Sequence, residues 1–101
     1  MKDNVVKDKS LEFDVRIVNL YKFLVNEQKE FVMSKQILRS GTSIGANIRE
    51  AEQAQSRADF INKLNIALKE ANETEYWLEL LIRTEYITRE QYESINNDST
   101  E

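Results

Sequence analysis

Apolar residues in the first half of the chain recur at intervals of three and four, the spacing of one face of an α-helix. The first such stripe predicts a helix over about residues 10–26, with Ser10 as its N-cap. A polar break separates it from a second predicted helix over about 34–54, for which Ser34 is the expected N-cap. The first stripe comprises Phe13, Ile17, Leu20, Tyr21 and Leu24, and the second comprises Ile37, Gly41, Ile44, Ile48 and Ala51.

The most regular pattern lies in the second half of the chain, where apolar positions alternate steps of four and three over three heptads. It predicts a helix over about 57–84, introduced by a capping box of Ser56 and Asp59. Further apolar residues lie beside this seam, which favours a helix that is central in its bundle or buried in an oligomer interface. The seam comprises Phe60, Leu64, Ala67, Ala71, Thr74, Leu78 and Leu81, and its flanks carry Ile61, Ile66, Leu68, Leu80 and Ile82.

A fourth, shorter helix is expected from about Arg89, with Thr88 as its N-cap. It offers only Tyr92 and Ile95 as large apolar side chains before the polar tail NNDSTE. A helix this short covers little of its neighbours. Either another chain completes the bundle, or the natural fourth helix is longer.

Four helices with short connections predict an all-α fold, an antiparallel up-down four-helix bundle with a short fourth helix. The length of 101 residues corresponds to a single domain over 1–101. The polar segments 1–9 and 96–101 are expected to fray.

Composition narrows the chemistry available to the chain. It contains no proline and two glycines, so the residues that usually mark turns and the ends of strands are nearly absent. It also lacks cysteine and histidine, which removes disulfides, thiolate metal sites and the usual general base. No apolar run is long enough to cross a membrane, and the N-terminus does not resemble a signal peptide. We therefore expect a cytoplasmic protein without a cofactor, an enzymatic activity or a membrane partner.

The net charge of −4 is unevenly distributed. Residues 1–57 carry 10 Lys/Arg and 8 Asp/Glu, a balance of +2, whereas residues 58–101 carry 4 and 10, a balance of −6. A general nucleic-acid-binding domain is usually basic. The remaining route to RNA or DNA is a row of Lys35, Arg39 and Arg49 on the second helix, repeated around the axis of an oligomer.

Both glycines of the chain lie in the segment RSGTSIGANIRE, four residues apart. Each costs about 1 kcal/mol relative to alanine inside a helix, which is reasonable if Gly41 and Gly45 let another helix approach closely. Ser43 and Asn47 have the same spacing on an adjacent face. We predict that these four residues and Glu70 form a helix-packing surface.

The middle of the third helix carries a polar block, Glu70, Asn72, Glu73, Thr74 and Glu75. It is either a solvated flank or a buried polar network that joins the third helix to the Ser43/Asn47 face of the second. A magnesium site built from Glu50, Glu70 and Glu73 is a remote alternative. Tyr76 and Trp77 are expected in the core or an interface, with stacking on a nucleobase as the alternative.

Residues 39–81 are similar to the central signature of the bacterial four-helix bundle protein family, which includes proteins encoded in intervening sequences of 23S rRNA genes. The residues that carry the resemblance, which extends over about 10–90, are Arg39, Ser40, Ser43, Ile44, Asn47, Ile48, Glu50, Phe60, Ile66, Ala67 and Glu70. The resemblance implies an up-down bundle that assembles as a homopentamer, without an enzymatic activity.

A relative in that family, the accessory protein of diversity-generating retroelements, uses a positive surface to bind nucleic acid and a reverse transcriptase. The present chain departs from its relatives, because it is acidic overall and lacks a long, basic fourth helix. The family name refers to the position of some of its genes, so no ribosomal role is carried over. The sequence therefore predicts a non-enzymatic oligomeric scaffold, pentameric by resemblance, with nucleic-acid binding through Lys35, Arg39 and Arg49 as the alternative.

Overall fold

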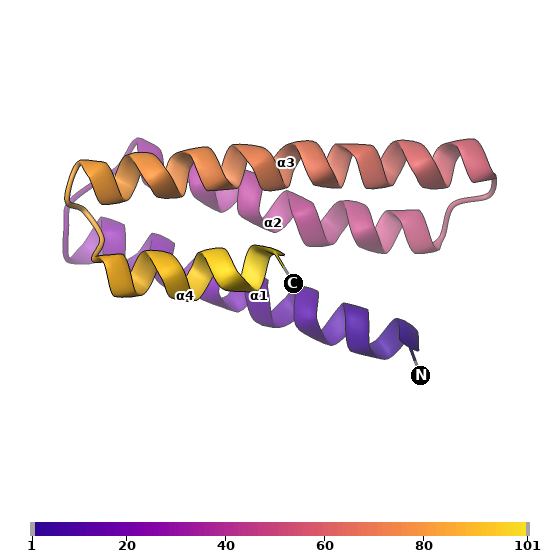
Figure 1. Ribbon diagram of the computed structural model, residues 1–101, viewed down its shortest axis with the longest axis horizontal. Helices are drawn as coiled ribbons and strands as arrows, with labels where there is room; N and C mark the ends of the chain where they lie inside the picture. The colour runs from indigo at the N-terminus through magenta and orange to yellow at the C-terminus, as the bar shows by residue number, and fades with distance from the viewer. Residues whose placement is uncertain (1, 101) are drawn as a thin grey trace.

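The computed structural model describes the backbone of residues 2–100 and the side chains of residues 8–96. Four α-helices follow one another: α1 (Lys2–Asn26), α2 (Met33–Glu52), α3 (Arg57–Arg83) and α4 (Arg89–Thr100) (Figure 1). The predicted all-α class is confirmed. Met1 and Glu101, which belong to the terminal segments expected to fray, lie outside the described residues.

The helices form an elongated up-down bundle measuring 43 × 24 × 19 Å. α2 and α3 run antiparallel along the long axis, and the shorter α4 lies beside α1 on the other side of the molecule (Figure 1). α2 packs on both α1 and α3, and α4 packs on both α3 and α1. Each helix therefore contacts two neighbours, as the short connections require.

The core lies where all four helices meet. The first predicted stripe is buried except for Tyr21, which is partly exposed, and the end of the α3 seam is buried with it. Ile87, in the connection between α3 and α4, closes this end of the core. The buried cluster comprises Phe13, Ile17, Leu20, Leu24, Ile37, Leu78, Leu81, Ile87 and Ile95.

The start of α2 differs from the prediction. Ser34 is fully buried inside the helix, which begins at Met33 without a side-chain cap from its N-cap residue. The Glu30 carboxylate takes that role, because it accepts the backbone N–H groups of Val32, Met33 and Ser34 at 3.2, 2.9 and 2.7 Å. A buried carboxylate therefore satisfies three first-turn donors, and its charge suits the positive end of the helix.

The predicted N-caps of the other three helices have different outcomes. α1 begins at Lys2, so Ser10 lies inside the helix and is not its N-cap. The Ser56 hydroxyl accepts the Asp59 N–H at 3.0 Å, which confirms the predicted cap of α3. At α4, the Thr88 hydroxyl accepts the Gln91 N–H at 3.1 Å while the Gln91 side chain accepts the Thr88 N–H at 2.8 Å. This reciprocal pair is a capping box.

The unequal helix lengths leave part of α3 without a partner on one side. α4 has 12 residues and α3 has 27, and α4 runs beside the half of α3 that ends at Arg83 (Figure 1). The half that begins at Arg57 extends past the end of α4 and still packs on α2.

Candidate functional site

A buried pair of hydroxyls joins the middles of α2 and α3. The Thr74 hydroxyl donates to the Glu70 carbonyl at 2.8 Å, and its oxygen lies 3.0 Å from the Ser40 hydroxyl. Both side chains are fully buried. This contact fixes the height of one helix against the other, because a slip would leave a buried hydroxyl without a partner.

An ion-pair cluster lies beside the hydroxyl pair. The Arg39 guanidinium contacts Glu73, and it donates to Glu70 at 3.4 Å. The Trp77 indole N–H also donates to Glu73, at 3.2 Å. These hydrogen bonds, Arg39 first and Trp77 second, lower the pKa of Glu73, and the Glu73 carboxylate raises the pKa of Arg39.

Ser43 and Asn47 do not contribute to this α2–α3 network, contrary to the prediction. The Ser43 hydroxyl donates to the Arg39 carbonyl at 2.7 Å, and the Asn47 amide donates to the Ser43 carbonyl at 2.8 Å. Both side chains thus bond one turn back along their own helix, a common local alternative for these residue types. Of the predicted packing residues, Glu70 alone bonds across the α2–α3 contact.

The two glycines face α1. A β-carbon on Gly41 would lie 2.9 Å from both Cγ atoms of Ile17 and 3.0 Å from its Cδ1. On Gly45 it would lie 3.1 Å from Asp14 Oδ2 and 3.4 Å from the Ser10 β-carbon. Glycine thus allows α1 to approach α2 closely at Gly41, where the neighbour is a fully buried side chain.

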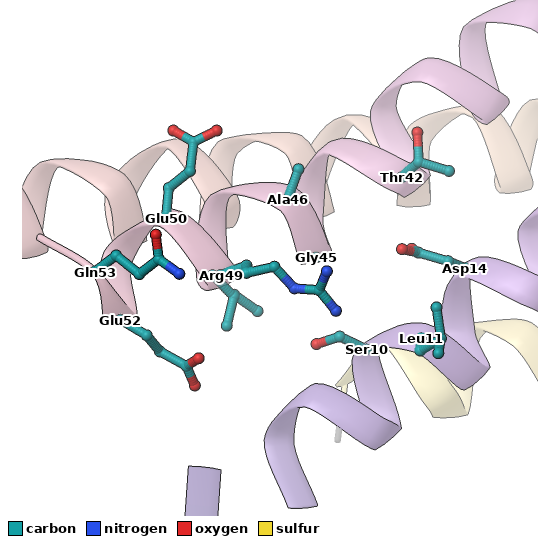
Figure 2. A pocket seen from close by; sticks show the side chains of 11 residues that line it. Ser10, Leu11, Asp14, Thr42, Gly45, Ala46, Arg49, Glu50, Glu52 and Gln53 are labelled. Atoms are coloured by element: carbon teal, nitrogen blue, oxygen red, sulfur yellow. The ribbon is translucent and has the colours of Figure 1, made fainter. Parts of the chain in front are cut away.

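A pocket of about 390 Å³ opens between α1 and α2 beside Gly45 (Figure 2). Asp14 and Ser10 project into it from α1, and the Arg49 side chain extends over it from α2 (Figure 2). Asp14 Oδ1 is buried without a hydrogen-bond partner among the described residues. Burial raises the pKa of Asp14 to about 6, and the nearby Arg49 charge partly opposes the rise.

The three basic residues proposed as nucleic-acid contacts have different surroundings. Lys35 is exposed, near the start of α2. Arg39 is held by the two carboxylates of α3, and Arg49 extends toward α1 over the pocket (Figure 2). The structure therefore does not present them as one uniform basic row, and the acidic partners of Arg39 weaken its attraction for phosphate.

The three carboxylates weighed as a magnesium site do not come together. Glu50 forms an ion pair with Lys63 at 2.9 Å, whereas Glu70 and Glu73 hold Arg39. Over residues 8–96, no group of three or more acidic side chains is arranged to hold a metal ion. No helix in the described part of the chain is long and apolar enough to cross a membrane.

An exposed apolar surface lies on the first half of α3, and we call it the α3 strip. Its side chains are between 38% and 62% exposed, although two of them belong to the predicted seam. The strip consists of Phe60, Ile61, Leu64 and Leu68. The spacing of these residues predicted a covered face, and the short fourth helix predicted from the sequence is too short to cover it. Trp77, farther along α3, packs on the core as predicted, whereas Tyr76 is exposed.

Comparisons with known proteins identify the family. The family model of the 23S rRNA-intervening sequence proteins matches residues 2–101. A crystal structure of a protein of unknown function from the S23 ribosomal protein family of Bacteroides thetaiotaomicron is similar, with 99% identity and a TM-score of 0.95. The match covers 99% of the present chain and 89% of that chain. No curated protein matches. The chain belongs to the 23S rRNA-intervening sequence protein family.

Proposed function

We propose that this member of the family is a non-enzymatic scaffold that works as a homo-oligomer assembled through the α3 strip. The observation that carries the proposal is the exposure of four neighbouring large apolar side chains on one helix. Single exposed apolar residues are normal on soluble proteins, but a contiguous group of them marks an interaction surface.

Covering this surface favours association. Covering a half-exposed leucine, isoleucine or phenylalanine contributes about 1 kcal/mol, so the four side chains contribute several kcal/mol per copy. Contacts of flanking residues would add to this free energy. The ordering of interface side chains and the loss of translational freedom would offset part of it. A closed ring repeats the contact in every subunit.

A second copy fits this surface better than the chain's own fourth helix does. The last apolar residue of α4 is Ile95, and the positions after it are Asn, Asn, Asp, Ser, Thr and Glu. These polar residues cannot cover Phe60 and Leu64 with apolar groups. We take another copy of the chain as the covering surface, and the family resemblance favours five copies.

Nucleic-acid binding is the weaker alternative. It would rely on Lys35, Arg39 and Arg49, and Arg39 is already paired with two carboxylates. The second half of the chain also adds a charge of −6 near any basic face. Oligomerisation would concentrate this negative charge together with the positive charge.

Size-exclusion chromatography with light scattering over about a hundredfold range of concentration tests the scaffold proposal, because self-association depends on mass action. We expect a mass several times 11.9 kDa that falls on dilution only at the lowest concentrations. A mass of 11.9 kDa throughout the range would contradict the proposal.

A further inference from the structure

We propose that the surface that covers the α3 strip is the outward face of α1 in a second copy of the chain, with the two helices parallel. This inference rests on the proposed self-association and adds the identity, direction and register of the contact. It follows from the matching of two exposed surfaces on α1 and α3.

The surface on α1, which we call the α1 strip, consists of Leu11, Val15 and Val18. Leu11 and Val15 are more than half exposed, and Val18 is partly exposed. Their spacing of four and three places them on one face of α1. The buried residues Phe13, Ile17 and Leu20 occupy the opposite face. α1 is therefore apolar on both faces, although the bundle uses only one of them.

The two strips have matching lengths. Val18 follows Leu11 by seven positions and Leu68 follows Ile61 by seven, so each span is about 10 Å at about 1.5 Å per residue. Over these two helical turns each strip presents three apolar positions, and Phe60 adds a fourth at the start of the α3 strip. Side by side, they can interdigitate in the manner of ridges and grooves on helices packed at a small angle.

The charges at the ends of the strips determine the direction of pairing. The α1 strip has Asp8 before it and Lys22 after it, whereas the α3 strip has Arg57 before it and Glu75 after it. The signs are opposite at each end only when the two helices run in the same direction. None of these four side chains forms an ion pair within the described part of the chain.

In that register the charged groups are within reach of each other. With Leu11 opposite Ile61, Asp8 and Arg57 differ in height by one residue, about 1.5 Å, and Lys22 and Glu75 differ by three, about 4.5 Å. The long arginine side chain can bridge the first offset, and the long lysine and glutamate side chains can bridge the second. An antiparallel arrangement would instead place Asp8 near Glu75 and Arg57 near Lys22, which is repulsive at both ends.

Pairing between two different surfaces has a consequence for the assembly. Each copy would offer its α1 strip to one neighbour and its α3 strip to another, which is a head-to-tail contact. Such contacts close into rings or continue as filaments, whereas a contact between two α3 strips would stop at a dimer. A ring can therefore form when the α3 strip of each copy binds the α1 strip of the next copy.

The test uses the full chain and light scattering, with circular dichroism as a check on folding. Leu68→Glu and Leu11→Glu are each expected to convert the oligomer to an 11.9 kDa species, because each buries a charge in the same contact. The matched control is Tyr76→Glu, on α3 but outside the strip and 59% exposed. The control should leave the oligomer intact.

A charge swap tests the direction of pairing without touching apolar residues. Lys22→Glu and Glu75→Lys are each expected to raise the concentration at which the oligomer dissociates, by about fivefold, the scale of one exposed ion pair. The two substitutions together should restore the original value, because the pair reforms with reversed signs. Restoration also supports the parallel contact between α1 and α3 if a glutamate variant in either strip fails to fold.

Two results would overturn the inference while the scaffold proposal stands. An oligomer that survives Leu11→Glu and dissociates with Leu68→Glu would show that α1 is not the partner of the α3 strip. Additive effects of the two charge substitutions, without restoration, would show that Lys22 and Glu75 do not meet. A wild-type monomer at every concentration would instead remove both proposals.

Discussion

Gly41→Ala gives the sharpest test of the packing between α1 and α2. Alanine is favoured over glycine by about 1 kcal/mol in a helix, so the substitution would stabilise an open site. At this position, however, the new β-carbon would lie 2.9 Å from two atoms of Ile17 and 3.0 Å from a third. Ile17 is fully buried in the core and has little room to move.

The two effects can be compared in magnitude. Overpacking a well-packed core costs about 1–3 kcal/mol, which equals or exceeds the gain in helix propensity. We therefore expect Gly41→Ala to lower the free energy of unfolding by up to about 2 kcal/mol. Gly45→Ala is the matched control, because its β-carbon would meet the end of the Asp14 side chain at 3.1 Å and no core atom. The control should be neutral or slightly stabilising.

Urea denaturation followed by circular dichroism measures both variants under the same conditions. Combining Gly41→Ala with Ile17→Ala should recover part of the loss, since the methyl group added to α2 would fill some of the space that the truncated side chain leaves. Equal stabilisation by Gly41→Ala and Gly45→Ala would refute the close approach at Gly41. So would strictly additive effects of Gly41→Ala and Ile17→Ala.

Three further outcomes are expected. Asp14→Asn should stabilise the protein by about 1 kcal/mol at pH 8 and much less at pH 4. The reason is that the native pKa of Asp14, about 6, lies above the ordinary 3.8, so native Asp14 loses its stabilising proton as the pH rises. Equal shifts of the melting temperature at both pH values would contradict this. Glu30→Ala should lower the free energy of unfolding by about 2 kcal/mol, because three backbone N–H groups at the start of α2 lose their acceptor. A change below about 0.5 kcal/mol in urea denaturation would contradict the role of Glu30 as the cap of α2. Labelled RNA and DNA should show little retention near physiological salt, whereas retention that weakens steeply with salt and is lost in Lys35→Glu would support the nucleic-acid alternative.

Much of the fold could be predicted from the spacing of apolar residues. Ile17, Leu24, Leu78 and Leu81 were placed on core faces by periodicity alone, and all four are fully buried. Periodicity is reliable here because a helix has one geometry and each stripe needs a neighbour. It says nothing about which element lies opposite, so it could not indicate that Leu64 would be left exposed.

The errors at helix starts and in the polar seam have a common physical cause. Ser34 and Ser43 carry hydroxyls that can bond to several backbone groups within reach, and sequence does not show which one is chosen. Glu30 acts as a cap from four residues before Ser34, in a turn where Lys29 adopts a positive φ of 55°. That conformation is uncommon for lysine and is not encoded in a local pattern.

The glycine pair illustrates what sequence can and cannot provide. Two glycines one turn apart predicted a close helix approach, and the reasoning holds for Gly41 because a buried side chain touches the site. Gly45 borders a pocket with a partly buried carboxylate, Asp14, to which the sequence patterns assign no role. The burial of Asp14 arises from the packing of α1 on α2, a long-range contact with no local signature.

Sedimentation velocity of the wild-type chain alongside Leu68→Glu tests the central claim most directly. We predict a wild-type particle with several times the mass of the 11.9 kDa chain, about 60 kDa for five copies, and a folded monomer for the variant. A wild-type chain that sediments as an 11.9 kDa monomer at high concentration, with the α3 strip exposed to water, would contradict the claim.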